Sequence, residues 1–298
     1  MGAVTACLIR ITPAFSVADK PAIIGQPSAS LRQSLVRWGG VAVLAGAVGF
    51  IAYRLMALNP QELLAQRSWT LLGAMAGASA IFAAANVLFA RGWTILADAD
   101  EIMSPKQAQG IYGRGVLTKY LPGSIFQYIS RQIGGQRAGL QTAVLVKASI
   151  DEALIHVAAS LWLAALLMMA GDRPLLACGA GIGLMGALCL AKSRPLRAMV
   201  MQLLAFAGFG LAAVITAASL FPENGQWLFF GGIFLTAWLA GFLIPVAPGG
   251  LGVREAALLA LSGAMIPAPE ALAAVLALRV SSIVGDLAYG SIAVWRSR

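Results

Sequence analysis

Charged residues are scarce in this sequence. They make up 11% of its 298 residues, whereas 59% are hydrophobic and the mean hydropathy is +0.82. Soluble globular domains carry about 25% charged residues, so the composition excludes a water-soluble domain and predicts a polytopic membrane protein. The apolar runs have the length of roughly 20 residues that a helix needs to cross a bilayer, and the alternating strands of a membrane barrel are missing from the pattern. We therefore predict an all-α polytopic membrane helix bundle.

Cysteine and histidine are equally scarce. Cys7, Cys178 and Cys189 lack the paired spacing of a disulfide framework or a metal site, and His156 is the only histidine. The stretch GGLG at 249–252 lacks the Gly-Lys-Ser/Thr ending of a phosphate-binding loop. No nucleophile and base can be assembled from the sequence either. We expect no metal, no cofactor and no enzymatic activity.

The chain divides into a basic tail and a transmembrane domain. Residues 1–37 contain no sustained apolar segment, which predicts a loosely ordered N-terminal tail. Residues 38–298 form one predicted domain with about seven spanning helices, at 38–57, 70–97, 142–170, 174–191, 198–221, 227–246 and 270–295. Two further apolar segments, 110–135 and 247–266, are interrupted by proline and glycine, and we consider both to be candidates for broken or re-entrant helices.

The basic residues predict the orientation. A net charge of +9 is explained by loops that face anionic lipid, and we do not expect nucleic-acid binding. The clearest basic cluster is Lys192, Arg194 and Arg197, which predicts a cytoplasmic loop. Counting back from this loop places the N-terminus in the cytoplasm if 110–135 enters and leaves on one face. The C-terminus stays open: re-entry of 247–266 from the cytoplasm puts it outside, and a crossing puts it inside.

The stretch PVAPGGLGVRE at 245–255 interrupts two apolar runs. Its prolines and glycines must end the preceding helix, and in lipid such a break is tolerated only inside protein or beside a hydrated cavity. We predict a new helix near Val253, whose first amides and Arg254 favour an anion such as phosphate. Glu255 would complement the helix dipole or form an ion pair with a basic residue elsewhere in the chain. The alternative is that Arg254 only anchors a loop at the lipid headgroups.

The earlier broken segment, 110–135, contains similar residue types. Lys119 and Tyr120 precede Pro122 and Gly123, and Arg131 follows. Breaks in corresponding positions of two halves are typical of transporters whose site lies between repeats. These charges would frame the same anion-binding cavity, or they would anchor the segment at the interface.

Ionisable residues also lie inside predicted spans, where they are expensive and usually face a bundle interior or water. Lys147 with Asp151, and Glu152 with His156, are four residues apart and share a helical face. Glu152 is a candidate counter-charge for Arg254 or Arg131, and an ordinary ion pair near the interface is the alternative. Asp286, Glu255 and Glu152 are the candidate partners of Arg279. Arg91 and Asn86 follow the same argument more weakly.

Small and aromatic residues predict packing and interface positions. The spacings of Gly73 with Gly77 and of Gly179 with Gly183 predict ordinary close helix packing rather than dimerisation. Tryptophans near span ends predict interface belts; they are Trp38, Trp69, Trp93, Trp227 and Trp295.

Two motifs resemble a known family. KYLPGSIFQYISRQ at 119–132 and PVAPGGLGVREAALLAL at 245–261, followed by an alanine-rich helix with Arg279, are similar to the membrane region shared by bacterial lysylphosphatidylglycerol synthases and stand-alone flippase-like integral membrane proteins. The resemblance covers residues 38–295. Positions that match the family's marked sites are Lys119, Pro122, Gly123, Pro248, Gly249, Gly250, Gly252, Arg254, Glu255 and Arg279. The family's Glu-Arg pair in the third span is Glu152-Ala153 here, so the charge network differs.

The resemblance implies a function. Larger members transfer lysine to phosphatidylglycerol with a soluble C-terminal domain and flip the product through the membrane region. The sequence ends at Arg298 without such a domain, so we expect only flipping of an anionic lipid or a polyprenyl-phosphate-linked lipid across the bacterial inner membrane. The expected substrate-binding residues are Lys119, Arg131, Glu152, Arg254, Glu255 and Arg279. The alternative is an accessory membrane subunit that binds a lipid-linked substrate for a cell-envelope glycosyltransferase.

Overall fold

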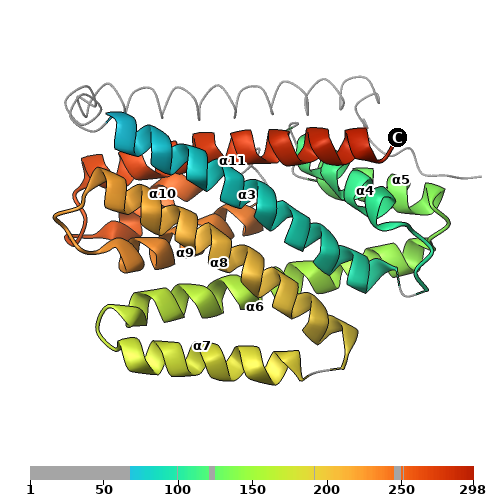
Figure 1. The fold of residues 1–298 in the computed structure, drawn as a ribbon, viewed down its shortest axis with the longest axis horizontal. Coiled ribbons are helices and arrows are strands. Elements are labelled where there is room, and N and C mark those ends of the chain that lie inside the picture. The colour runs from blue at the N-terminus through green and yellow to red at the C-terminus, as the bar shows by residue number, and fades with distance from the viewer. Residues whose placement is uncertain (1–67, 99, 121–124, 191, 245–249, 251) are drawn as a thin grey trace, which may run out of the picture. The chain divides into compact units, whose positions relative to one another are not determined.

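The computed structural model describes residues 68–98, 100–120, 125–190, 192–244, 250 and 252–298, and these residues form helices and loops without strands. The helices, shown in Figure 1, are α3 (Ser68–Ala97), α4 (Pro105–Thr118), α5 (Phe126–Arg137), α6 (Thr142–Ala170), α7 (Pro174–Cys189), α8 (Arg194–Leu220), α9 (Trp227–Leu243), α10 (Val253–Ser262) and α11 (Ala268–Arg296). The all-α prediction is confirmed for this part of the chain. The predicted tail 1–37, the predicted span 38–57, Pro122, Gly123, Pro248 and Gly249 lie outside the described residues.

Four helices are long and apolar enough to cross a membrane. These are α3, α6, α8 and α11, in which the apolar stretches have 27 to 29 residues. The shorter apolar helices α7 and α9 have 16 and 17 residues; at 1.5 Å per residue they reach only about 25 Å. The described helices therefore fit a multi-pass membrane protein, but the predicted count of seven spans is not reached among them.

The polarity of the bundle is inverted relative to that of a soluble protein. Leu154 and Ile182 are 64% and 75% exposed, whereas Glu152 is 3% exposed. The other buried polar or charged residues are Asn86, Asp98, Arg131, His156, Ser160, Gln202, Thr216, Glu255, Ser262, Ser281 and Asp286. Water would favour the opposite distribution, so an apolar environment around the bundle explains this one.

Two pairs of shorter helices form hairpins at opposite ends of the bundle (Figure 1). α4 and α5 pack on each other at the end where α3 finishes and α6 begins. α9 and α10 pack on each other at the other end, where Asn224 Nδ2 donates to the carbonyl oxygen of Met265 at 3.2 Å and ties the loop before α9 to the loop after α10. α9 is uninterrupted within the predicted segment 227–246, and α10, within the predicted broken segment 247–266, returns to the end where α9 starts.

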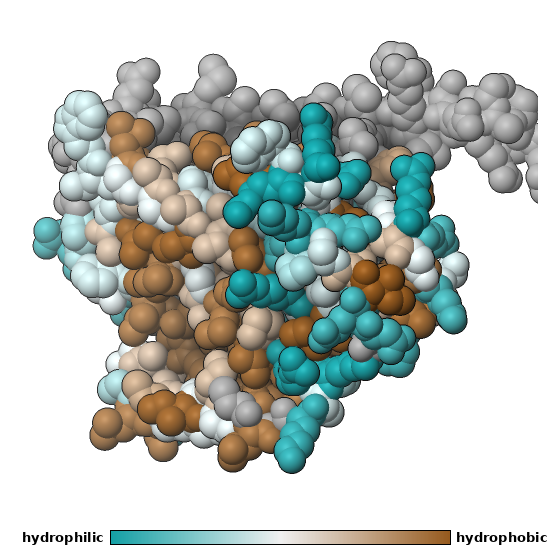
Figure 2. Space-filling view, turned by 45° about the vertical axis from the view of Figure 1, so that its right-hand side comes forward, coloured by the Kyte–Doolittle hydropathy of each residue, from teal (hydrophilic) through white to brown (hydrophobic). Residues whose placement is uncertain are grey.

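The end of α11 and the start of α8 lie at the same end of the bundle (Figure 1). Arg194, Arg197 and Arg296 line one groove together with Lys106 at the start of α4. Figure 2, turned so that the α4–α5 end comes forward, shows hydrophilic side chains gathered on this end and hydrophobic ones beyond it. Of the two alternatives for the C-terminus, the arrangement matches the one that puts it on the same side as the basic loop at 192–197.

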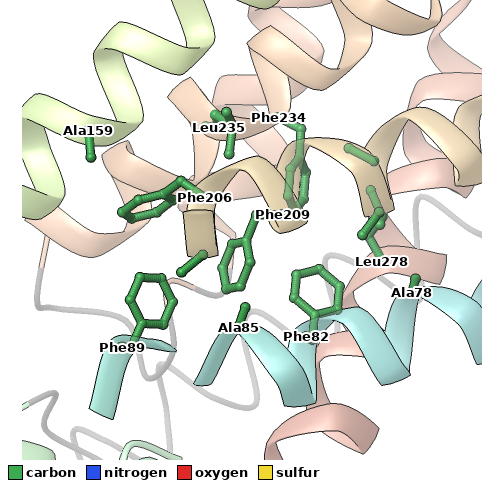
Figure 3. Close-up of a cluster of buried hydrophobic side chains, with 14 of the residues drawn as sticks. Ala78, Phe82, Ala85, Phe89, Ala159, Phe206, Phe209, Phe234, Leu235 and Leu278 are labelled. Carbon is green, nitrogen blue, oxygen red and sulfur yellow. The ribbon is translucent and has the colours of Figure 1, made fainter. Parts of the chain in front are cut away.

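The core between α3, α8, α9 and α11 is rich in aromatic residues and alanine (Figure 3). The rings of Phe82 and Phe209 meet edge to face with centroids 4.6 Å apart, and Phe89 and Phe206 meet in the same way at 5.2 Å. Small residues such as Ala85 let the helix backbones approach. This apolar layer borders the charged residues described below.

The predicted small-residue contacts are not formed at Gly73, Gly179 and Gly183. A Cβ atom built on any of them would have no atom within 4 Å. The close backbone contacts occur at Gly232 and Gly285, where a Cβ atom would lie 2.8 Å and 2.6 Å from carbonyl oxygens of neighbouring helices. Sequence spacing alone does not show which helix face meets a partner.

Trp93 is not an interface residue, so the prediction is wrong at this position. It is 0% exposed, because α4 packs over this part of α3 and brings the Tyr112 ring to 6.1 Å. Trp69 and Trp295 are 84% and 72% exposed, as residues of an interface belt should be.

Candidate functional site

Asp286 on α11 ties the tip of the α4–α5 hairpin to the bundle. Its carboxylate is 4% exposed and accepts from Lys119 Nζ at 2.5 Å and from Asn86 Nδ2 at 2.7 Å. The Tyr120 hydroxyl also donates to it. A buried carboxylate needs a cation and further donors to compensate for lost hydration, and Asp286 has both.

Glu152 on α6 pairs with Arg131 on α5. Arg131 Nη1 donates to Glu152 Oε2 at 2.6 Å, with side chains 6% and 3% exposed, and the Tyr112 hydroxyl donates to Oε1 at 3.1 Å. The Arg131 guanidinium also lies over the rings of Tyr112 and Tyr128, at 4.8 and 4.9 Å from their centroids. Of the two proposed partners of Glu152, the structure selects Arg131.

Glu255 in the first turn of α10 has two roles. Its Oε1 accepts from Arg279 Nη1 at 2.6 Å, and its Oε2 accepts from the backbone N–H of Gly252 at 2.7 Å, as in half of a capping box. Both alternatives for Glu255 therefore hold, and Arg279 takes one of its three predicted partners. Gly250 and Gly252 have φ values of 71° and 82°, which favour glycine, and α10 begins at Val253 as predicted.

Of the four cations Lys119, Arg131, Arg254 and Arg279, Arg254 forms no ion pair with a described carboxylate. The cluster holds four cations and three carboxylates, and the three ion pairs formed among its described residues leave Arg254 out. Its Nε is buried without a hydrogen-bond partner, and its Cζ lies 5.3 Å from the centroid of the Trp238 ring. Arginine stays protonated in proteins, so a charged donor is held here without an ion-pair partner among the described residues.

Two glycines make room for Arg254. A Cβ atom on Gly241 at the end of α9 would stand 2.5 Å from Arg254 Cγ, and one on Gly250 would stand 2.9 Å from its Nε. The guanidinium therefore lies between the end of α9 and the loop before α10. Any larger side chain at either position must displace it.

Two small cavities meet at Arg254. The first, of about 100 Å³, is also lined by Lys119, Arg131 and Glu152. The second, of about 60 Å³, is also lined by Lys119, Arg279 and Asp286. Cavities of this size hold several waters or one group the size of a phosphate.

An aromatic wall closes the first cavity. His156 stacks between Phe89 and Phe242, with ring centroids 4.9 and 5.4 Å away. Its Nδ1 lies 2.9 Å from the carbonyl oxygen of Glu152, which can only accept, so the ring proton is on Nδ1. The structure therefore gives His156 a packing role beside Trp238, whose ring lies 5.9 Å away.

The structure brings most of the predicted site residues together. Lys119, Arg131, Glu152, Arg254 and Arg279 line the two cavities, and Glu255 is fully buried behind Arg279.

Two other predicted charges lie apart from this site. Lys147 and Asp151 form an ion pair at 2.5 Å, and the Lys147 side chain is 74% exposed. This pair is therefore an ordinary exposed ion pair. Arg91 is exposed and lines a different groove. In the described part of the chain, no three His, Cys, Asp or Glu side chains gather as metal ligands.

Sequence reasoning missed three contributors, Tyr112, Trp238 and Gly241, and it named Tyr120 without a role for its hydroxyl. A signal was present for Trp238, because it lies in the middle of an apolar segment instead of at its end. The hydroxyl and glycine roles carry no comparable signal, since they depend on which helices meet.

Comparison with known proteins does not assign the chain to a family. No protein-family model matches the chain, and neither curated proteins nor solved structures match it. The resemblance to the lysylphosphatidylglycerol synthase membrane region therefore depends on the two motifs.

Proposed function

We propose that the protein translocates an anionic lipid, or a lipid-linked intermediate with a phosphate group, across the bacterial inner membrane. The observation that supports this is Arg254, which lines both cavities and has no carboxylate partner among the described residues. A phosphate accepts two parallel hydrogen bonds from a guanidinium and would neutralise the excess positive charge. Lys119, with 30% of its side chain exposed, lines the same cavities and is the second group available to the phosphate.

In this proposal the two hairpins are re-entrant and the basic end faces the cytoplasm. α5 exposes Ile129 and Ile133 and buries Arg131, which suits a helix surrounded by lipid. Helix breaks at membrane depth require a protein interior or a hydrated cavity, and broken helices that meet at a substrate site are typical of transporters. The basic cluster at 192–197 supports a cytoplasmic N-terminus, and we include membership of the lysylphosphatidylglycerol synthase membrane-region family in the proposal.

The paired charges would keep binding reversible. Asp286, Glu152 and Glu255 each hold one neighbouring cation, so an entering phosphate meets one uncompensated guanidinium and not four. Trp238 gives Arg254 a resting partner through a cation–π contact when no phosphate is bound. A carrier needs this balance, because a lipid that binds too tightly is not released.

The proposal is tested by flipping assays in liposomes. Purified protein is reconstituted with fluorescent phosphatidylglycerol, and in parallel with a labelled polyprenyl phosphate, and the labelled lipid that moves between leaflets is followed by reduction of the exposed label. Arg254→Ala should lower the rate by at least tenfold. The matched control is Lys147→Ala, which removes an exposed, paired lysine and should flip at the wild-type rate. Equal flipping rates for Arg254→Ala, wild type and empty liposomes would contradict the proposal.

The same preparation tests the accessory-subunit alternative. Lipid that binds in an Arg254-dependent way without any flipping would support a subunit that presents its lipid to an enzyme. Binding and flipping that both depend on Arg254 support translocation.

A further inference from the structure

A large cavity lies apart from the central site. It is a groove of about 1360 Å³ between α3, α4, α8 and α11, at the basic end of the bundle. Among the described residues, none lines both this groove and either central cavity. Gln109 and Tyr289 lie at its wall, where Gln109 Nε2 donates to the Val87 carbonyl oxygen at 3.3 Å and the Tyr289 hydroxyl donates to Gln109 Oε1 at 2.7 Å. This contact joins three helices beside the groove.

The mouth of the groove is strongly basic. Its cationic lining residues are Arg91, Lys106, Arg194, Arg197 and Arg296. The acidic residues are Asp98 and Glu101, and Asp98 is already engaged, because its two oxygens accept from the backbone N–H groups of Ile102 and Met103 at 2.8 Å each. No ion pair involving Arg91, Lys106, Arg197 or Arg296 occurs among the described residues. The groove therefore carries an excess of positive charge.

Much of the remaining lining is apolar. Ala83, Ala84, Val87, Ile95 and Ile292 come from α3 and α11, and Ile292 is 54% exposed. Small-molecule pockets enclose roughly 300–1,000 Å³, so this groove is larger than a free phosphate or a nucleotide requires. A basic mouth beside an apolar channel matches a molecule with an anionic head and a long apolar tail.

We propose that this groove is a second lipid site, which binds an anionic phospholipid with its phosphate at the basic mouth and an acyl chain along α3 and α11. This inference depends on the membrane setting and not on Arg254 or on translocation. The competing explanation is diffuse attraction of the basic loop to headgroups. The two differ in which cations matter, because diffuse attraction depends on every exposed base whereas a site depends on those that line it.

The chain offers matched pairs for this distinction. Lys192 is exposed in the same basic cluster as Arg194 and Arg197 but does not line the groove. On α3, Ala80 and Ala84 are both exposed, one turn apart, and only Ala84 lines the groove. Phenylalanine at 84 would fill the channel, whereas phenylalanine at 80 would not.

Native mass spectrometry of detergent-purified full-length protein, equilibrated with dioleoyl phosphatidylglycerol or dioleoyl phosphatidylcholine, tests the site. In the Arg254→Ala background, which removes the proposed central anion site, we expect phosphatidylglycerol adducts that fall at least fivefold when R91Q/R197Q or Ala84→Phe is added, and that persist when Lys192→Gln or Ala80→Phe is added. Thermal melting confirms that each variant is folded, and Ala84→Phe tests the site without any change of charge. Equal loss in Lys192→Gln and R91Q/R197Q, or equal retention of the two lipids, would overturn the proposal. Absence of phosphatidylglycerol adducts from Arg254→Ala itself would also overturn it, since the adducts would then belong to the central site.

Discussion

Arg254 lies directly against Gly241: a Cβ atom on Gly241 would stand 2.5 Å from Arg254 Cγ and 2.8 Å from its Nε. The contact joins α9 to α10 across the helix break. The position of the Arg254 guanidinium therefore depends on a residue that bears no charge and no side chain. In the proposed function, Gly241 would be a positioning residue for the anion at Arg254.

Gly241→Ala should displace Arg254 and lower lipid flipping by roughly tenfold, equivalent to about 1.4 kcal/mol. The control is Gly179→Ala on α7, where a Cβ atom meets nothing within 4 Å. Glycine to alanine in a helix favours the helix by up to about 1 kcal/mol, so general helix loss cannot explain a defect. Flipping assays on both variants decide, and a wild-type rate for Gly241→Ala would show that the close contact has no functional weight.

Glu152 and its sequence neighbour Asp151 should differ sharply in their contribution to stability. Glu152→Leu leaves Arg131 buried without its partner and should lower the free energy of unfolding by about 3–5 kcal/mol. Asp151→Leu breaks an exposed pair and should cost under about 1 kcal/mol. The double variant R131M/E152L should recover most of the loss, because the uncompensated charge is gone.

Denaturation in detergent, followed by circular dichroism, measures these differences. A double variant as unstable as Glu152→Leu alone would contradict the ion-pair explanation.

Trp238→Leu should weaken function through Arg254. Its ring centroid lies 5.3 Å from Arg254 Cζ, and a cation–π contact contributes about 0.5–2 kcal/mol, so flipping should fall severalfold. Trp295→Leu changes a residue that is 72% exposed and should leave the rate unchanged. Similar rates for the two variants would argue against the stacking role.

Cysteine labelling checks the topology. In a background without the native cysteines, Glu223→Cys and Ala264→Cys should react with an impermeant maleimide added outside intact cells. Lys192→Cys and Arg298→Cys should react only after permeabilisation, because α11 ends at the end of the bundle where α8 starts and the Asn224–Met265 contact joins the loops at the opposite end. Labelling of position 298 together with position 223 in intact cells is incompatible with this fold.

The sequence by itself determined the class of protein and the helix break before α10. Long apolar runs and few charges leave helices in a membrane as the consistent solution, because backbone groups in lipid must bond within their own segment. The start of α10 at Val253 follows from local conformational limits of proline and glycine. The sequence also indicated that buried charges such as Arg279 require partners, since unpaired charges in lipid are costly.

Only the tertiary structure decided which charges pair. Glu152 had several candidate cations and Arg279 had three candidate carboxylates. The packing of the two hairpins against α3, α6 and α11 paired Lys119 with Asp286, Arg131 with Glu152 and Arg279 with Glu255. Arg254 was left over as a result of those three assignments. Hydrophobic length and helix breaks are properties of neighbouring residues, whereas ion pairing in a bundle depends on helices far apart in the chain. The sequence could therefore identify the candidate charged residues, and only the fold shows which of them form ion pairs.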